Sequence, residues 1–325
     1  MPQAKNSTLY FAGSDGDKAV YWENGVEHLL PSTLGARVNF ISVSGSDVYF
    51  VGFEGPGTEV SFPSPAVYWK NDVKYTFSYL NSVINSNSSN FSSLDLVSNV
   101  VFSGGNTYIG VTNDNTAEYW INGAKHAEPT IDPSQPASYV NHTFLSGTDL
   151  YLAGYDGGHH LPAYWKNGAE TVLPLTQVLT NDPANPTSLG EVNRIYVSGP
   201  DVYCAGWDGW TLAYWKNGTE HTLPVITPQT TPTTTGKISG IALSGADLYI
   251  IGSDGNAAVY WKNGIETELP SKATAYAAGI AFKGTDVYIA GTDNLQPVYW
   301  KNGTEVSLPC VDFYAIATTT AAANQ

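Results

Sequence analysis

The sequence predicts an all-β protein, a closed seven-bladed β-propeller built from four-stranded antiparallel blades. A Tyr-Trp pair recurs seven times, and an Asn-Gly turn (once Asn-Asp) follows each pair. The tryptophans of successive pairs lie 39 to 51 residues apart, which is the length of a four-stranded blade with its loops. The seven pairs are Tyr21-Trp22, Tyr68-Trp69, Tyr119-Trp120, Tyr164-Trp165, Tyr214-Trp215, Tyr260-Trp261 and Tyr299-Trp300.

The best-preserved repeat contains four predicted strands, which we term a, b, c and d. They are 237–243 (a), 248–252 (b), 258–262 (c) and 265–269 (d). Strands c and d are joined by Asn263-Gly264. An Asn-Gly pair between strand residues predicts a type I′ hairpin, because both central positions of that turn need positive φ. Repeated hairpins of this kind predict antiparallel blades.

The two ends of the chain predict how the blades close. The first strand-like segment, Thr8–Gly13, matches strand b and has no strand a before it, whereas Asp312–Thr318 matches a strand a with no blade after it. We therefore expect the C-terminal strand to complete the first blade in a 3+1 closure. The prediction is a single domain, 1–325, with blades at 8–30 plus 311–318, 37–77, 96–128, 139–173, 191–223, 237–269 and 276–308.

The adjacent Tyr and Trp of strand c are interpreted as core residues. Successive side chains of a strand point to opposite faces. Each aromatic can therefore fill the gap to a different neighbouring blade, and the series is not read as a stacking surface for sugars or bases.

Composition excludes several function classes. With 14 basic and 29 acidic side chains the chain has a net charge of −15, which argues against nucleic acid and anionic membranes as partners. No apolar run approaches the length that spans a bilayer, about 20 residues. Cys204 and Cys310 are read as buried small side chains, with a single bridge between them as the alternative. No cofactor is predicted. The few basic residues and the Thr-, Asn- and Pro-rich loops favour an extracellular or periplasmic protein whose export signal is not in this chain; a cytoplasmic location stays open.

The segment Tyr299–Gly303 (Tyr-Trp-Lys-Asn-Gly), with Asp286–Gly291 before it, resembles repeats of secreted bacterial seven-bladed propeller proteins whose function is largely unassigned. The resemblance covers nearly the whole chain and implies the same fold, but it carries no catalytic residues. The sequence lacks the Gly-His and Trp-Asp pairs of WD repeats, the double glycine of Kelch repeats and the Asp boxes of sialidases.

The loops predict which end of each blade carries function. The a–b and c–d turns are minimal and form what we term the turn end. The b–c and d–a connections form the loop end and carry all the length variation, and function concentrates on such loops. The long d–a connections are 78–99, 130–140, 175–190 and 225–236. Each b–c loop contains one acid, and we interpret these acids as turn residues rather than as metal ligands. They are Asp15, Glu54, Asp114, Asp156, Asp208, Asp254 and Asp293.

Two tryptophans do not belong to the repeat, and both lie in the b–c loop of blade 5, Trp207-Asp208-Gly209-Trp210. The corresponding loop of the neighbouring blade 4 contains Tyr155, Asp156, His159 and His160. Flat aromatic faces beside carboxylates suit a carbohydrate or another polar ring. These seven residues, Tyr155, Asp156, His159, His160, Trp207, Asp208 and Trp210, are the predicted ligand site.

The predicted function is non-enzymatic, lectin-like carbohydrate binding through the loop end. No catalytic residue and no metal ligand is predicted, because the chain lacks a nucleophile elbow, a zinc-binding HExxH and a phosphate loop. Two alternatives stay open: a scaffold that binds a protein surface, and a lyase or hydrolase that uses the histidines and carboxylates at the channel mouth.

Overall fold

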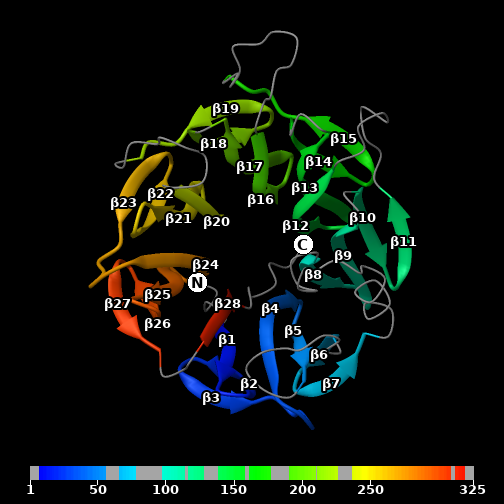
Figure 1. The fold of residues 1–325 in the computed structure, drawn as a ribbon, viewed down its shortest axis with the longest axis vertical. Coiled ribbons are helices and arrows are strands. Elements are labelled where there is room, and N and C mark those ends of the chain that lie inside the picture. The colour runs from blue at the N-terminus through cyan, green and yellow to red at the C-terminus, as the bar shows by residue number, and fades with distance from the viewer. Residues whose placement is uncertain are drawn as a thin grey trace, which may run out of the picture. The chain divides into compact units, whose positions relative to one another are not determined.

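The computed structural model describes residues 7–55, 66–77, 97–113, 116–127, 138–157, 161–176, 190–209, 211–225, 236–308 and 312–318. Every regular element in these ranges is a strand, and the strands form seven four-stranded antiparallel sheets (Figure 1). The fold class is therefore the predicted one, a seven-bladed β-propeller. The chain divides into two compact units, the first with blades 1, 2 and 7 and the second with blades 3 to 6, apart from residues 102–106 of the first unit. No helix of the described chain could cross a bilayer.

The first unit contains three blades. Blade 1 consists of β1 (Leu9–Asp15), β2 (Lys18–Glu23), β3 (Val26–Leu29) and β28 (Asp312–Thr318). Blade 2 consists of β4 (Ala36–Ser44), β5 (Asp47–Glu54), β6 (Ala66–Lys70) and β7 (Val73–Thr76). Blade 7 consists of β24 (Ala275–Lys283), β25 (Asp286–Asp293), β26 (Gln296–Lys301) and β27 (Thr304–Ser307).

The second unit contains four blades. Blade 3 consists of β8 (Val97–Ser103), β9 (Asn106–Asn113), β10 (Thr116–Ile121) and β11 (Ala124–Ala127), and blade 4 of β12 (Tyr139–Ser146), β13 (Asp149–Asp156), β14 (Leu161–Lys166) and β15 (Ala169–Val172). Blade 5 consists of β16 (Gly190–Ser198), β17 (Asp201–Asp208), β18 (Thr211–Lys216) and β19 (Thr219–Thr222). Blade 6 consists of β20 (Gly236–Ser244), β21 (Asp247–Asp254), β22 (Ala257–Lys262) and β23 (Ile265–Glu268).

The predicted 3+1 closure is confirmed. The sheet order of blade 1 is β28-β1-β2-β3, and Figure 1 shows the red β28 beside the blue β1. The two strands are antiparallel, with Leu9 opposite Thr318 and Ser14 opposite Asp312. A strand from the C-terminal part of the chain thus supplies the innermost strand of the first blade.

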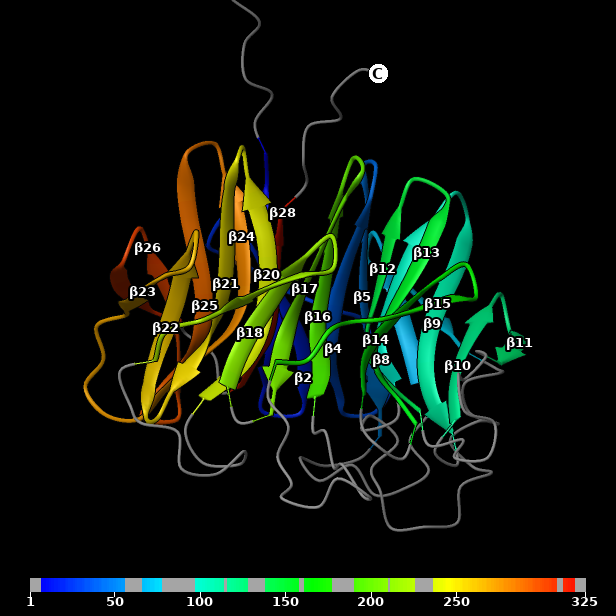
Figure 2. The ribbon, with the colours of Figure 1, turned by 90° about the horizontal axis from the view of Figure 1, so that it is seen from above.

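The Asn-Gly turns adopt the predicted conformation. In blade 5, Asn217 has φ 50° and Gly218 has φ 79°. The Asn217 side chain also explains why Asn is needed: its Oδ1 accepts the N–H of Val202 at 2.9 Å, and its Nδ2 donates to Asp201 at 2.8 Å. The c–d turn is thereby tied to the a–b turn at the same end of the blade. Figure 2 shows the corresponding β20–β21 turn of blade 6 at the upper edge of its sheet.

The Tyr-Trp pairs form the core between blades, as predicted. In the second unit, Trp215 of blade 5 packs in one cluster with Tyr151 and Tyr164 of blade 4. In the first unit, Trp69 of blade 2 packs with Tyr21 of blade 1. The indole rings of Trp69, Trp165, Trp215, Trp261 and Trp300 are fully buried. In blade 5 the pair reaches both neighbours, since Tyr214 packs in one cluster with Trp261 of blade 6.

A β-bulge in strand a explains the glycine of strand b, which ends segments such as Asp201–Gly206 and Asp286–Gly291. In blade 5 the pairing of β16 with β17 shifts between Val192 and Arg194. A Cβ on the facing Gly206 would lie 1.9 Å from the Glu191 carbonyl oxygen, so only glycine fits there. The bulge leaves side chains of strand a directed to the next blade, and Arg194 Nε donates to the Ser239 carbonyl of blade 6 at 2.6 Å.

Strand b is longer than predicted. The acids expected in the b–c loops are instead the last strand residues, as for Asp156, Asp208, Asp254 and Asp293. All four side chains are buried, and those of Asp208 and Asp293 bind the neighbouring d–a connection, as described below. Of the remaining predicted features, Cys204 is buried and free, while Cys310 and Asp114 lie outside the described residues.

Candidate functional site

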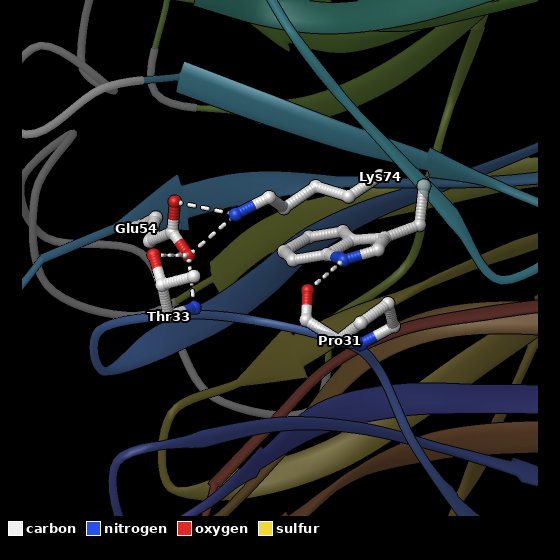
Figure 3. Close-up of polar contacts among 5 residues, drawn as sticks. Pro31, Thr33, Glu54 and Lys74 are labelled. Carbon is white, nitrogen blue, oxygen red and sulfur yellow. Dashed lines mark hydrogen bonds and ion pairs between the residues drawn. The ribbon is translucent and has the colours of Figure 1, made fainter.

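A polar arrangement recurs at the loop end of the blades, and blade 2 shows it most completely (Figure 3). Glu54, the last residue of β5, accepts the Thr33 N–H at 2.7 Å and the Lys74 ammonium at 2.8 Å through each of its two oxygens. Trp69 Nε1 donates to the Pro31 carbonyl at 2.7 Å. We call this arrangement a clasp: the acid that ends strand b, the Trp of strand c, the strand d residue opposite that Trp, and the Pro-containing connection that they hold.

The same clasp parts occur in other blades. In blade 5, Asp208 accepts the N–H of Thr176 at 2.8 Å and Trp215 Nε1 donates to the Pro174 carbonyl at 2.9 Å. In blade 7, Asp293 accepts the Lys272 N–H at 2.8 Å. The corresponding indole bonds of blades 6 and 7 are Trp261 to Pro224 and Trp300 to Pro270, both at 2.7 Å. Each clasp pins the start of a d–a connection to the end of a blade.

The recurring acids are therefore structural. Asp156 and Asp208 are only 1% exposed, and Asp254 and Asp293 are 3% exposed. Within the described ranges, no three His, Cys, Asp or Glu side chains come together as a metal site. Five carboxylates of the row that the sequence suggested are buried in the blades, namely Glu54, Asp156, Asp208, Asp254 and Asp293, whereas Asp15 is exposed. The buried five do not offer a charged surface to a ligand.

The clasps differ in how their charge is balanced. In blade 2, burial opposes ionisation of Glu54, but Lys74 and the Thr33 N–H outweigh it and lower the Glu54 pKa. In blades 5, 6 and 7 the strand d residue is a second acid, and in blade 7 Lys272 lies 2.7 Å from it. Burial, followed by the adjacent Asp208 carboxylate, raises the pKa of Glu220 to about 7. Burial and Asp254 likewise raise the pKa of Glu266 to about 7. These two clasps bring two carboxyl groups together.

The predicted site residues fall into three groups. Trp210, His159 and His160 lie outside the described residues. Asp156 and Asp208 are buried at the ends of β13 and β17. Tyr155 and Trp207, one position earlier in the same two strands, are partly exposed, although Trp207 also packs against the core between blades 5 and 6.

The structure brings two further residues to this end of blades 4 and 5. Tyr139, the first residue of β12, stacks on Tyr155 with ring centroids 5.1 Å apart and an interplanar angle of 19°. Glu191, in β16, is paired with Trp207, and its Oε1 accepts the Asn193 Nδ2 at 2.6 Å. Burial raises the pKa of Tyr155 above its ordinary value, with smaller contributions from Tyr139 and Glu191. Two stacked rings, an indole and a carboxylate thus share the loop end of these two blades.

Strand a also carries polar residues that the sequence analysis did not single out. His142 Nδ1 accepts the Ile195 N–H at 3.4 Å, and burial together with the Arg194 charge lowers its pKa to about 3. Arg194 bonds the carbonyls of Ser239 and Asn193, and burial lowers its pKa to about 10. The sequence signal is a polar pair directly after a valine of strand a, Asn141-His142 after Val140 and Asn193-Arg194 after Val192. These side chains join blades, and His142 is neutral at physiological pH.

Comparison with known proteins supports the fold alone. No family model matches the chain, and no curated protein matches it. Among solved structures, apo AztD from Citrobacter koseri aligns with a TM-score of 0.50 and 10% identity over 96% of this chain and 98% of that chain. The dihydro-heme d1 dehydrogenase NirN in complex with DHE aligns with a TM-score of 0.49 and 13% identity over 96% of this chain and 66% of that chain. A nidogen/laminin complex gives a TM-score of 0.45 and 9% identity over 97% of this chain and 99% of that chain.

Proposed function

We propose that the protein is a non-enzymatic, lectin-like binding protein that binds carbohydrate at the loop end of blades 4 and 5. Tyr155, Tyr139 and Trp207 present aromatic faces on which a sugar ring can stack, and Glu191 is a hydrogen-bond acceptor for its hydroxyl groups. Trp210, His159 and His160 belong to the same proposal through their place in the two b–c loops. An extracellular or periplasmic location is part of the proposal, since it fits such a ligand.

One observation carries the proposal: at this end the clasp acids are buried, whereas the neighbouring aromatic and acidic side chains are partly exposed. The clasp acids Asp156 and Asp208 are enclosed, whereas Tyr155, Tyr139, Trp207 and Glu191 keep accessible surface. At the position of Tyr155 and Trp207, blade 2 has the buried Phe53 and blade 6 the buried Ser253. Blades 4 and 5 therefore expose larger ring surfaces at a position that is closed in those blades.

A glycan array tests the proposal. We expect the protein to bind a restricted set of glycans, and the Tyr155→Ala, Trp207→Ala double variant to lose at least tenfold in affinity, since stacking rings contribute roughly 0.5–1.5 kcal/mol each beyond their buried area. Tyr276→Ala is the matched control, because Tyr276 is an exposed aromatic near the start of strand a in blade 7. Equal binding by the double variant would show that the site lies elsewhere.

Absence of glycan binding would instead favour the protein-binding scaffold. Affinity capture with the double variant as the comparison then distinguishes the two, because a partner that uses this end is lost together with Tyr155 and Trp207. A lyase or hydrolase activity that survives His159→Ala, His160→Ala would contradict the predicted place of any catalytic site.

A further inference from the structure

The clasp of blade 5 places one hydroxyl group between two carboxyl groups. Thr176 Oγ1 lies 2.7 Å from Asp208 Oδ2 and 3.2 Å from Glu220 Oε1, and the Thr176 N–H donates to the same Asp208 oxygen. A hydroxyl has a single hydrogen to donate. When that hydrogen goes to Asp208, the Thr176 oxygen can only accept from Glu220. The Glu220 carboxyl must then carry a proton.

The second oxygen of Glu220 supports the same protonation state. Glu220 Oε2 is buried and has no hydrogen-bond partner among the described residues. A buried oxygen of an ionised carboxylate without a donor is costly, whereas the carbonyl oxygen of a neutral carboxyl group costs far less. The clasp of blade 6 repeats this feature, since both oxygens of Glu266 are buried without such a partner in the described part of the chain.

The clasps of blades 2 and 7 show what replaces the proton elsewhere. In blade 2, Lys74 occupies the strand d position of Glu220 and places its ammonium 2.8 Å from the acid. In blade 7, strand d carries Glu305, and Lys272 of the connection supplies the ammonium at 2.7 Å. A fixed positive charge thus joins the parts of these two clasps. In blade 5 no lysine among the described residues takes that place.

We propose that the blade 5 clasp is a proton-operated latch: protonated Glu220 holds the segment Pro174–Thr176 against β17, and ionised Glu220 releases it. Ionisation of Glu220 leaves no hydrogen between its carboxylate and the Thr176 oxygen, and the repulsion between them weakens the Thr176 bonds to Asp208. Because Trp207 precedes Asp208, the latch lies at the loop end of blade 5. It stands whether or not that end binds carbohydrate.

The charges around Glu220 indicate that the latch operates near neutral pH. From β17 the Asp208 carboxylate faces it, from the connection the Thr176 hydroxyl, and from β18 the uncharged Trp215, which is paired with it. On β19 itself, His221 points to the opposite face and stacks on Tyr214 at 4.6 Å. Burial is the larger cause that raises the Glu220 pKa, and the Asp208 carboxylate is the next; a Thr176 hydroxyl that donated to Glu220 rather than to Asp208 would lower it.

Native-state amide exchange tests the latch, with the full chain at pH 5.5 and pH 8.0 and after correction for the intrinsic pH dependence of exchange. We expect the protection of the Thr176 amide to fall about tenfold at the higher pH, the factor that one pKa unit of linkage produces. The Thr33 amide, held by the lysine-balanced clasp of blade 2, is the internal reference and should keep its protection. Two variants, Glu220→Gln and Glu220→Lys, should keep Thr176 protected at both pH values.

Two results would overturn the proposal. One is equal protection of Thr176 at the two pH values in the native sequence. The other is a loss of protection that persists in Glu220→Gln and Glu220→Lys, since neither side chain can become an ionised carboxylate. His221→Asn should leave the wild-type behaviour unchanged, and a loss of the pH response in that variant would assign the response to the histidine instead.

Discussion

The two ends of a blade differ in how the acidic side chains of strand b are balanced. At the turn end, blades 2, 4, 5, 6 and 7 repeat one cluster in which a lysine and the turn asparagine bind the first aspartate of strand b. At the loop end of the same five blades, the acid that closes strand b is buried, and its partners differ from blade to blade. The turn-end clusters are half-exposed and each balances one acid with one base. The loop-end clasps are enclosed, and those of blades 5, 6 and 7 hold two acids, which Lys272 balances in blade 7.

This difference shows where uniform repetition stops. Solvent screens the turn-end charges, so an exposed pair contributes little and can be copied without consequence. A buried acid must be balanced by a proton, an ammonium or backbone N–H groups, and the choice changes the local pKa. The loop end is thus the end at which blades of one repeat acquire separate properties.

Removal of a clasp tryptophan should have the largest effect. Trp215→Ala leaves a cavity between blades 4 and 5 and an unpaired Pro174 carbonyl, because the indole is fully buried and donates to that oxygen. We expect a loss of about 3–5 kcal/mol in the free energy of unfolding, measured by urea titration. Trp207→Ala, at a partly exposed position of the same blade, is the control and should cost clearly less. Similar losses in the two variants would contradict the assigned burial.

Breaking the charged clasp of blade 2 should come next. Glu54→Gln leaves the Lys74 ammonium without its partner at 2.8 Å, and we expect a loss of about 2 kcal/mol after allowance for the partial exposure of Lys74. Adding Lys74→Met should recover most of the loss, since it removes the unpaired charge. Urea unfolding at pH 7 measures both. A double variant as unstable as Glu54→Gln would mean that the ion pair is not the cause.

The two-acid clasps should make stability fall as pH rises. Glu220 and Glu266 have folded-state pKa values of about 7 against an ordinary value of 4.5. The folded chain therefore binds more protons than the unfolded chain, and the stability present below about pH 4.5 is lost as pH rises through 7. We expect Glu220→Gln with Glu266→Gln to flatten this decline and to gain about 1 kcal/mol at pH 8. Glu305→Gln in blade 7, where Lys272 balances the acid, should give no such gain.

The smallest effect is expected at the turn end. Asp201→Asn removes one acid from a cluster in which Lys216 and Asn217 contact it, but the side chain remains able to accept hydrogen bonds. We expect the thermal midpoint to change by less than about 1 °C in 0.15 M salt. A larger destabilisation would show that the turn-end cluster is less well screened than its exposure indicates.

The fold could be predicted because its signals are local and repeated. Two residues are enough to predict a type I′ turn, and the Tyr-Trp pair predicts that both faces of strand c are buried. The prediction for the last residue of strand b is wrong because Gly-x-Asp-Gly is typical of turns, whereas Asp208 is paired with Gly190 of β16 and Thr211 of β18. The proximity of Glu220 and Asp208 could not be predicted from the sequence either, since two hairpins bring these residues together. For the proposed ligand site, sequence supplied Tyr155 and Trp207, but Tyr139 and Glu191 follow from strand pairing alone.

The pairing of β1 with β28 has a consequence for synthesis. Leu9 is paired with Thr318, so blade 1 gains its innermost strand only after residue 318 has been synthesised. Ribosomes add about 5–20 residues per second, so the inner edge of β1 stays open on the order of half a minute after it is made. An unpaired strand edge is a template for association with other chains. Aggregation is therefore expected mainly between neighbouring nascent chains on one messenger RNA, and slow translation should lower the soluble yield of the protein.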